Sequence, residues 1–123
     1  MRSMTIYNRG DVVVVNVPFS DGTGTKPRPA LIISNPSFHN ALPDIIVCPI
    51  SSQPRYHTKP GAGDCPILQW EALKLRYEST VRVSKILSVD KEIIGRKLGI
   101  MAKTDMSKVE SALCAALVLQ RSA

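Results

Sequence analysis

Short runs of β-branched and other apolar residues, separated by turn formers, dominate the first half of the chain. Residues 11–19 read DVVVVNVPF, residues 28–35 read RPALIISN, and residues 44–51 read DIIVCPIS. Such runs are typical of strands. We therefore predict three strands here. The alternate positions of the first strand that should share one face are Val13, Val15, Val17 and Phe19.

The middle of the chain is less regular. Residues 53–64, QPRYHTKPGAGD, contain two prolines and two glycines, which predicts a long polar loop without regular structure. Residues 79–89 alternate and predict one strand, bulged and continuing after Lys85. We expect a single helical turn over residues 90–97 and a last short strand over residues 98–101.

The C-terminal segment has helical periodicity from Thr104, with Ser107 and Glu110 arranged as a capping box. Residues 112–119, ALCAALVL, are apolar on every side of such a helix. A helix of this kind needs cover on more than one face, from the β-domain and from a second subunit. The positions with helical spacing are Met106, Val109, Leu113, Ala116 and Leu117.

Five or six short strands followed by one helix predict a mainly β fold with a C-terminal helix. The expected architecture is a small, strongly curved β-barrel on which the helix packs. With 123 residues and no repeat or linker, the chain is expected to form a single domain over residues 1–123.

Sixteen Lys and Arg residues against ten Asp and Glu residues give a net charge of +6. This balance favours a polyanionic partner, either nucleic acid or an acidic protein, although charge that only maintains solubility is an alternative. The three cysteines, Cys48, Cys65 and Cys114, lack zinc-ligand spacing and indicate reduced thiols in a cytoplasmic protein. No apolar run is long enough for a membrane span, so no membrane association is expected.

Familiar catalytic motifs are missing from the sequence. It contains no GxSxG, HExxH or Walker motif, and no acidic pair has metal-ligand spacing. His39 and His57 both fall in predicted loops, where a solvent-exposed histidine is the expected role. Neither a metal nor another cofactor is expected.

A set of cationic and hydroxyl side chains remains as candidate chemistry. Arg28 opens the second predicted strand, Ser51 and Ser52 follow the third, and Arg82 lies in the fourth. An arginine fork binds two phosphate oxygens, and a serine can donate a further hydrogen bond. Together they could assist attack of an RNA 2′-hydroxyl on its own phosphodiester. The alternative is that the arginines are solvated and the serines cap a turn.

Five segments in order resemble the PemK/MazF family of bacterial type II toxins. They are RGDVVVVNVPF, GTKPRPALIIS with its Arg-Pro pair, VCPISSQ, ESTVRVSKILSVDKEIIGRKLGIM, and MSKVESALCAALVL. The likeness covers nearly the whole chain. It implies an SH3-like barrel that forms a homodimer, and a cognate acidic antitoxin that blocks the site. The implied activity is sequence-specific, metal-independent cleavage of single-stranded RNA by 2′-hydroxyl attack, which would inhibit translation and growth.

By the same resemblance, Arg28 takes the position of the catalytic arginine and Ser51 that of a catalytic threonine. Lys26, Gln53 and Arg82 would hold the RNA backbone, and the mobile loops 20–27 and 53–64 would supply specificity. The remaining candidate RNA contacts are Thr23, Ser52, Tyr56 and His57, of which Tyr56 and His57 could stack on bases.

The sequence departs from some family members at two positions. Thr23 replaces a loop glutamate, and Ser84 replaces an acidic residue two places after Arg82. If the reaction needs a carboxylate base, Asp21 and Glu78 are the nearest candidates. Two other functions stay open: a non-enzymatic toxin of the same fold that poisons DNA gyrase, and a degenerate member that only binds RNA or its antitoxin.

Overall fold

The computed structural model describes residues 5–120. None of the helices within this range is long and apolar enough to span a membrane. The elements are the strands β1 (Asp11–Pro18), β2 (Thr25–Ile32), β3 (Asp44–Ser51), β4 (Asp64–Pro66), β5 (Thr80–Arg82), β6 (Leu87–Asp90) and β7 (Ile94–Ile100), the helices α1 (Pro36–His39), α2 (Pro54–Thr58) and α3 (Lys103–Leu117), and the 3-10 turns η1 (Glu71–Leu73), η2 (Val83–Lys85) and η3 (Lys91–Ile93).

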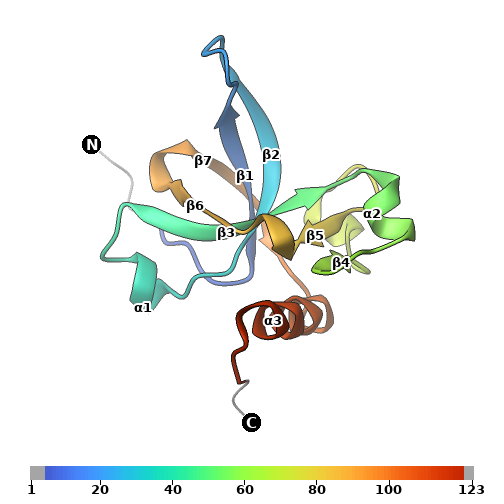
Figure 1. Ribbon diagram of the computed structural model, residues 1–123. Coiled ribbons are helices and arrows are strands. Elements are labelled where there is room, and N and C mark those ends of the chain that lie inside the picture. The colour runs from blue at the N-terminus through green and yellow to red at the C-terminus, as the bar shows by residue number, and fades with distance from the viewer. Residues whose placement is uncertain (1–4, 121–123) are drawn as a thin grey trace.

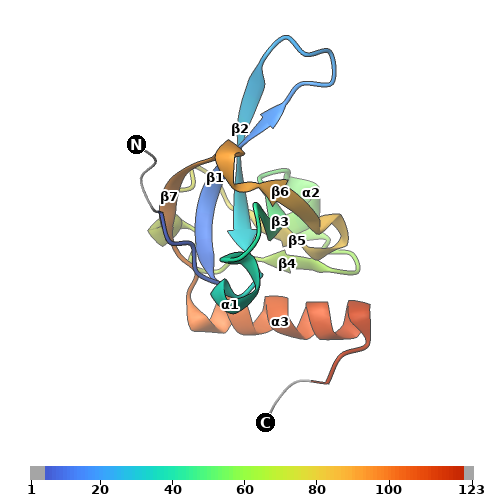
Figure 2. The same ribbon diagram turned by 90° about the vertical axis from the view of Figure 1, so that its left-hand side faces the viewer.

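All strand pairs are antiparallel, in the order β4-β5-β3-β2-β1-β7, and β6 pairs with β3 as well. Because β3 pairs with β2, β5 and β6, the sheet bends around this strand. Helix α3 lies across one end of the sheet, and the β1–β2 hairpin projects from the other end (Figures 1 and 2). The predicted mainly β fold with a C-terminal helix is confirmed.

Strand β1 is buried on both faces and divides the interior into two clusters. Val12 belongs to a cluster with Leu31 and the α3 residue Val109, whereas Val13 and Val15 belong to a cluster with residues of β2, β3, β6 and β7. Only the start of the strand is enclosed in this way. Of the residues predicted to share one face, Val13 and Val15 are buried, whereas those near the tip of the hairpin are exposed, because the tip leaves the body of the protein (Figure 2). The exposed members of that face are Val17 and Phe19.

Strand β2 begins at Thr25, three residues before the predicted start, so Arg28 lies inside the strand and pairs with Val15. The flanking prolines are tolerated because both nitrogens face the edge toward β3. Odd-numbered residues share this edge, as Ile33 shows, because its N–H donates to the carbonyl oxygen of Ile46 just after β2 ends. Since β3 pairs with β2 only over Ala30–Ile32, no ladder bond is lost at either proline.

The prediction of a loop over residues 53–64 is confirmed for residues 59–63 and wrong for residues 54–58, which form α2. Pro54 occupies the first turn of α2, where its missing N–H costs nothing, and β4 begins at Asp64. Gly63 turns the chain with φ +80° and accepts a hydrogen bond from Val83 N at 2.9 Å, which joins β4 to the segment after β5. Tertiary contacts therefore organise this segment despite its polar composition.

The prediction of one strand over residues 79–89 is also wrong. Val81 pairs with Ile50 and Leu87 pairs with Val47, so six residues advance on this segment while β3 advances by three. The turn η2 takes up the three extra residues and separates β5 from β6. After β6, the expected single helical turn is present as η3. The last strand, β7, is longer than predicted because it pairs with β1 along most of its length.

Helix α3 begins at Lys103 after Ala102, so the predicted capping box at Ser107 and Glu110 is wrong and both residues lie within the helix. The periodicity is confirmed over its first part. The helical residues that bury their side chains against the sheet are Met106, Val109 and Leu113. Ala116 and Leu117 are exposed, because the sheet covers only one face of the helix end.

His39 lies in α1 and is fully buried, so the prediction of an exposed loop histidine is wrong. Its Nδ1 atom lies 2.7 Å from Ser34 Oγ, and its Nε2 atom lies 2.7 Å from the carbonyl oxygen of Tyr7. The imidazole therefore joins three separate segments of the chain. Satisfied on both nitrogens, it serves the fold and is remote from the groove described below.

The buried thiols should resist alkylation in the folded protein. Burial, followed by the neighbouring Cys65 thiol, raises the pKa of Cys48 to about 12, and burial also raises the pKa of Cys65. Because the thiolate is the reactive form, we expect no modification of Cys48 or Cys65 by iodoacetamide at pH 8, and full modification in urea, read by mass spectrometry. Rapid labelling of Cys48 without denaturant would contradict this packing.

Candidate functional site

A groove of about 780 Å³ runs between β2, the end of β3, α2, β5 and β7. Seven of the nine site residues predicted from the sequence line it: Lys26, Arg28, Ser51, Ser52, Gln53, Tyr56 and Arg82. The strand order explains the assembly, because β2 and β5 both pair with β3 and so bring Arg28 and Arg82, 54 positions apart in the sequence, to one surface. The cationic residues that line the groove are Lys26, Arg28, Lys74, Arg76, Arg82, Lys85 and Arg96.

Arg28 projects from the part of β2 that extends beyond β3. Its backbone is fixed by pairing with Val15, while Pro27 and Pro29 hold φ on both sides. The residue is exposed and lines the groove. A guanidinium on a rigid strand can bind an anion there with little loss of backbone entropy.

Ser51 ends β3 opposite Thr80 of β5. Its Oγ accepts a hydrogen bond from the backbone N–H of Gln53 at 3.2 Å, so it helps to turn the chain into α2. A hydroxyl that accepts in this way keeps its own proton to donate. The residue thus has the turn-capping role that the sequence left as an alternative, and it also lines the groove.

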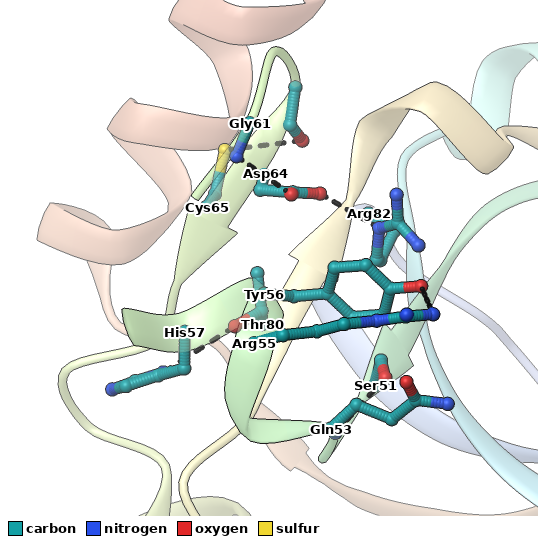
Figure 3. A network of polar contacts seen from close by, with 11 residues as sticks. Ser51, Gln53, Arg55, Tyr56, His57, Gly61, Asp64, Cys65, Thr80 and Arg82 are labelled. Carbon is teal, nitrogen blue, oxygen red and sulfur yellow. Dashed lines mark hydrogen bonds and ion pairs between the residues drawn. The ribbon is translucent and has the colours of Figure 1, made fainter. Parts of the chain in front are cut away.

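Arg82 is held in the groove by two neighbouring side chains. Its Nε donates to Asp64 Oδ1 at 2.8 Å, and the two side chains are 18% and 4% exposed, respectively. The guanidinium carbon of Arg82 lies 3.6 Å from the centre of the Tyr56 ring, and that of Arg55 lies 4.7 Å from it. Figure 3 shows this group of four side chains above Ser51 and Gln53. Asp64 and Tyr56 therefore hold the Arg82 head in place.

The Tyr56 hydroxyl is itself engaged. Arg55 Nη2 donates to Tyr56 Oη at 2.6 Å, and this hydrogen bond is the main reason why the pKa of the Tyr56 phenol lies below its ordinary value. The charges of Arg55 and Arg82 lower it further. Because Arg82 covers one face of the ring, stacking of an RNA base on that face would require Arg82 to move.

Thr23 and His57 do not line the groove. The Thr23 N–H and hydroxyl both donate to Asp21 Oδ1 in the tip of the β1–β2 hairpin, at 3.0 and 2.7 Å, and they lower the pKa of the Asp21 carboxyl. His57 points the other way along α2 (Figure 3). Its Nδ1 lies 3.3 Å from the Ser79 carbonyl oxygen, and its Nε2 lies 3.3 Å from Glu78.

The residues that sequence reasoning missed are Asp64, Arg55 and four cations of the groove rim. Arg55 and Asp64 lie within residues 53–64, which were predicted to form a loop, and only pairing of β4 with β5 sets Asp64 opposite Arg82. The one signal in the sequence that pointed to these residues was the number of charged residues close to Tyr56 along the chain. The four rim cations are Lys74, Arg76, Lys85 and Arg96.

No carboxylate or imidazole lines the groove among residues 5–120. The two carboxylates considered from the sequence, Asp21 and Glu78, lie outside it, bound to Thr23 and His57. Within the same residues, His, Cys, Asp and Glu side chains form no group of three that could hold a metal ion. The groove is thus strongly positive and offers tyrosine, serine, lysine and arginine side chains to a ligand.

A family model described as PemK-like, MazF-like toxin of type II toxin-antitoxin system matches residues 8–117. Among solved structures, an endoribonuclease in complex with its cognate antitoxin from Mycobacterial species has a TM-score of 0.73 and 20% identity, covering 95% of this chain and 100% of that one. A MazE-MazF structure (Form-III) from Deinococcus radiodurans has a TM-score of 0.76 and 18% identity, with 94% and 100% coverage. Curated protein sequences give no match. The family model spans most of the chain, and the protein therefore belongs to the PemK-like, MazF-like toxins of type II toxin–antitoxin systems.

Proposed function

We propose that the protein is an endoribonuclease that cleaves single-stranded RNA at specific sequences without a metal, and thereby inhibits translation and growth. The observation that carries the proposal is the meeting of Arg28 and Ser51 in one groove, which within residues 5–120 is lined by six further cations and no carboxylate. Such a groove attracts a phosphodiester chain and stabilises negative charge that develops on a phosphate.

In this proposal, each group has a defined role. Arg28 binds the non-bridging oxygens of the reacting phosphate, and the Ser51 hydroxyl donates to the same group or orients the attacking 2′-hydroxyl. Attack of the 2′-oxygen on phosphorus expels the 5′-oxygen and leaves a 2′,3′-cyclic phosphate. Lys26, Gln53 and Arg82 hold the flanking backbone.

An acidic antitoxin and a second copy of the chain are the proposed protein partners. Both the positive groove and the net charge of +6 favour an acidic segment as inhibitor. A second groove, of about 410 Å³, adjoins the exposed end of α3 and supports dimer formation through apolar contact. Its apolar lining residues include Ile33, Ile46, Ile86, Leu113, Leu117 and Leu119.

Incubation of the purified protein with a long single-stranded RNA in EDTA tests the proposal. We expect new 5′-hydroxyl ends at a recurring short sequence, and these ends should form more slowly with Ser51→Ala present at the same concentration. Because a hydrogen bond to a charged group is worth about 1.5–3 kcal/mol, Ser51→Ala should slow cleavage by at least about tenfold. RNA left intact, with gyrase trapped on DNA, would favour the gyrase-poison alternative, and RNA bound but uncleaved would favour the degenerate one.

A further inference from the structure

The proposed reaction needs a group that removes the proton of the attacking 2′-hydroxyl, and the groove lacks the usual ones. Its lining residues within 5–120 include neither Asp, Glu nor His. The groups that could exchange a proton there are the lysines and the phenols of Tyr56 and Tyr77. A lysine ammonium attracts the phosphate, whereas a phenol can accept a proton where neighbouring cations stabilise its anion, which leaves the two phenols as candidates.

Two arginines contact the Tyr56 phenol. The Tyr56 hydroxyl accepts a hydrogen bond from Arg55 at 2.6 Å, and its ring carries the guanidinium of Arg82 at 3.6 Å. Asp64 in turn pairs with Arg82 and fixes its position. The Tyr77 side chain, by contrast, is 65% exposed. Two guanidiniums stabilise a phenolate at Tyr56 more than a phenol.

The position of Tyr56 suits a role in proton transfer. The residue lies on α2, which starts three residues after Ser51, and both residues line the groove. In Figure 3 the hydroxyl end of Tyr56 points to the side on which Ser51 and the Arg82 head lie. Since Arg82 covers a face of the ring, the hydroxyl is better placed than the ring faces to meet RNA.

We propose that Tyr56 is the general base of this site, an inference that rests on the proposed ribonuclease function. The phenolate oxygen of Tyr56 accepts the proton of the RNA 2′-hydroxyl as the 2′-oxygen forms its bond to phosphorus. The bond from phosphorus to the 5′-oxygen breaks, and water protonates that oxygen. The products are a 2′,3′-cyclic phosphate, a 5′-hydroxyl, and a Tyr56 phenol that returns its proton to solvent.

The pH dependence follows from the charges around the ring. The charged groups that face Tyr56 are Arg55 from α2 and Arg82 from β5, with Asp64 of β4 behind Arg82. Both arginines lower the pKa of the phenol from its ordinary value of 10.0. The phenolate fraction therefore rises with pH and levels off at a lower pH than for a free tyrosine, and the rate of cleavage should do the same.

Tyr56→Phe is the decisive variant because it keeps the ring that packs on Arg82 and removes only the hydroxyl. Single-turnover cleavage in EDTA from pH 6 to pH 10 should slow by about 10²–10⁴-fold, the usual contribution of a general base, and should lose its rise with pH. The affinity for a 2′-deoxy analogue, which cannot react, should change by less than about threefold, because the variant loses at most one weak neutral hydrogen bond to the RNA. Tyr7→Phe, a matched change outside the groove, should behave like the wild type.

Arg55→Gln supplies a second, independent readout. Loss of its hydrogen bond should shift the midpoint of the pH profile upward, and ultraviolet absorbance should show the Tyr56 phenol titrating at higher pH than in the wild type. A wild type that leaves all RNA intact would overturn the proposed function together with this inference. If the wild type cleaves RNA and Tyr56→Phe is equally fast or equally dependent on pH, the assignment of Tyr56 as general base is refuted and the proposed function stands. Loss of the pH dependence in Tyr77→Phe instead would also overturn it.

Discussion

Replacement of Arg28 by alanine is expected to lower the single-turnover rate of RNA cleavage by about 10²–10³-fold, the loss typical of a removed transition-state donor. Arg28 lies inside β2, paired with Val15 and flanked by two prolines, so its head is preorganised for the phosphate. Rates at saturating protein, followed by gel electrophoresis of an end-labelled RNA, would measure the effect. Arg28→Lys should recover only part of the rate, because an ammonium cannot form the two-pronged contact.

Arg96→Ala is the matched control for Arg28→Ala. Arg96 is also an exposed arginine of the groove, but it lies on β7, which β1 and β2 separate in the sheet from β3, the strand that ends at Ser51. Its removal should weaken RNA binding and lower the slope of log affinity against log salt concentration by about one. The rate at which bound RNA is cleaved should change little. If Arg96→Ala slowed the cleavage of bound RNA as much as Arg28→Ala does, the special role of Arg28 would be refuted.

Replacement of Asp105 by alanine should have the largest effect on stability. Its carboxylate, 2% exposed, accepts hydrogen bonds from the backbone N–H groups of Leu68 at 2.9 Å and Gln69 at 3.0 Å, and so attaches α3 to the segment after β4. Because the variant leaves two buried donors without a charged acceptor, we expect a loss of about 3–5 kcal/mol in the free energy of unfolding. Urea denaturation at fixed protein concentration would measure it.

Two further variants make the Asp105 experiment specific. Asp105→Asn keeps one carbonyl oxygen but turns an N–H₂ group toward a backbone donor, so it should lose part of the stability. Asp21→Ala removes an exposed carboxylate that accepts hydrogen bonds from Thr23 of its own hairpin. This variant should leave the midpoint of urea denaturation nearly unchanged. A midpoint for Asp105→Ala equal to that of the wild type would mean that water replaces the carboxylate.

Local patterns predicted the parts of the fold in which each residue's environment follows from its neighbours in sequence. The strands over residues 11–18 and 44–51 and the helical face of Met106, Val109 and Leu113 were predicted from periodicity. Predictions failed where pairing with a distant strand decided the geometry, as for the break at η2 between β5 and β6.

The same division applies to the candidate site. The sequence by itself determined that Arg28 lies between two prolines, which restrict φ, next to a loop over residues 20–27, and that hydroxyls follow the third strand. Only the tertiary structure decided which charges meet, because the pairing of β4 with β5 sets Asp64 opposite Arg82 and α2 brings Tyr56 onto it. Periodicity reports the face on which a side chain lies, whereas long-range pairing chooses its neighbours, and it is the neighbours that set a phenol's affinity for its proton.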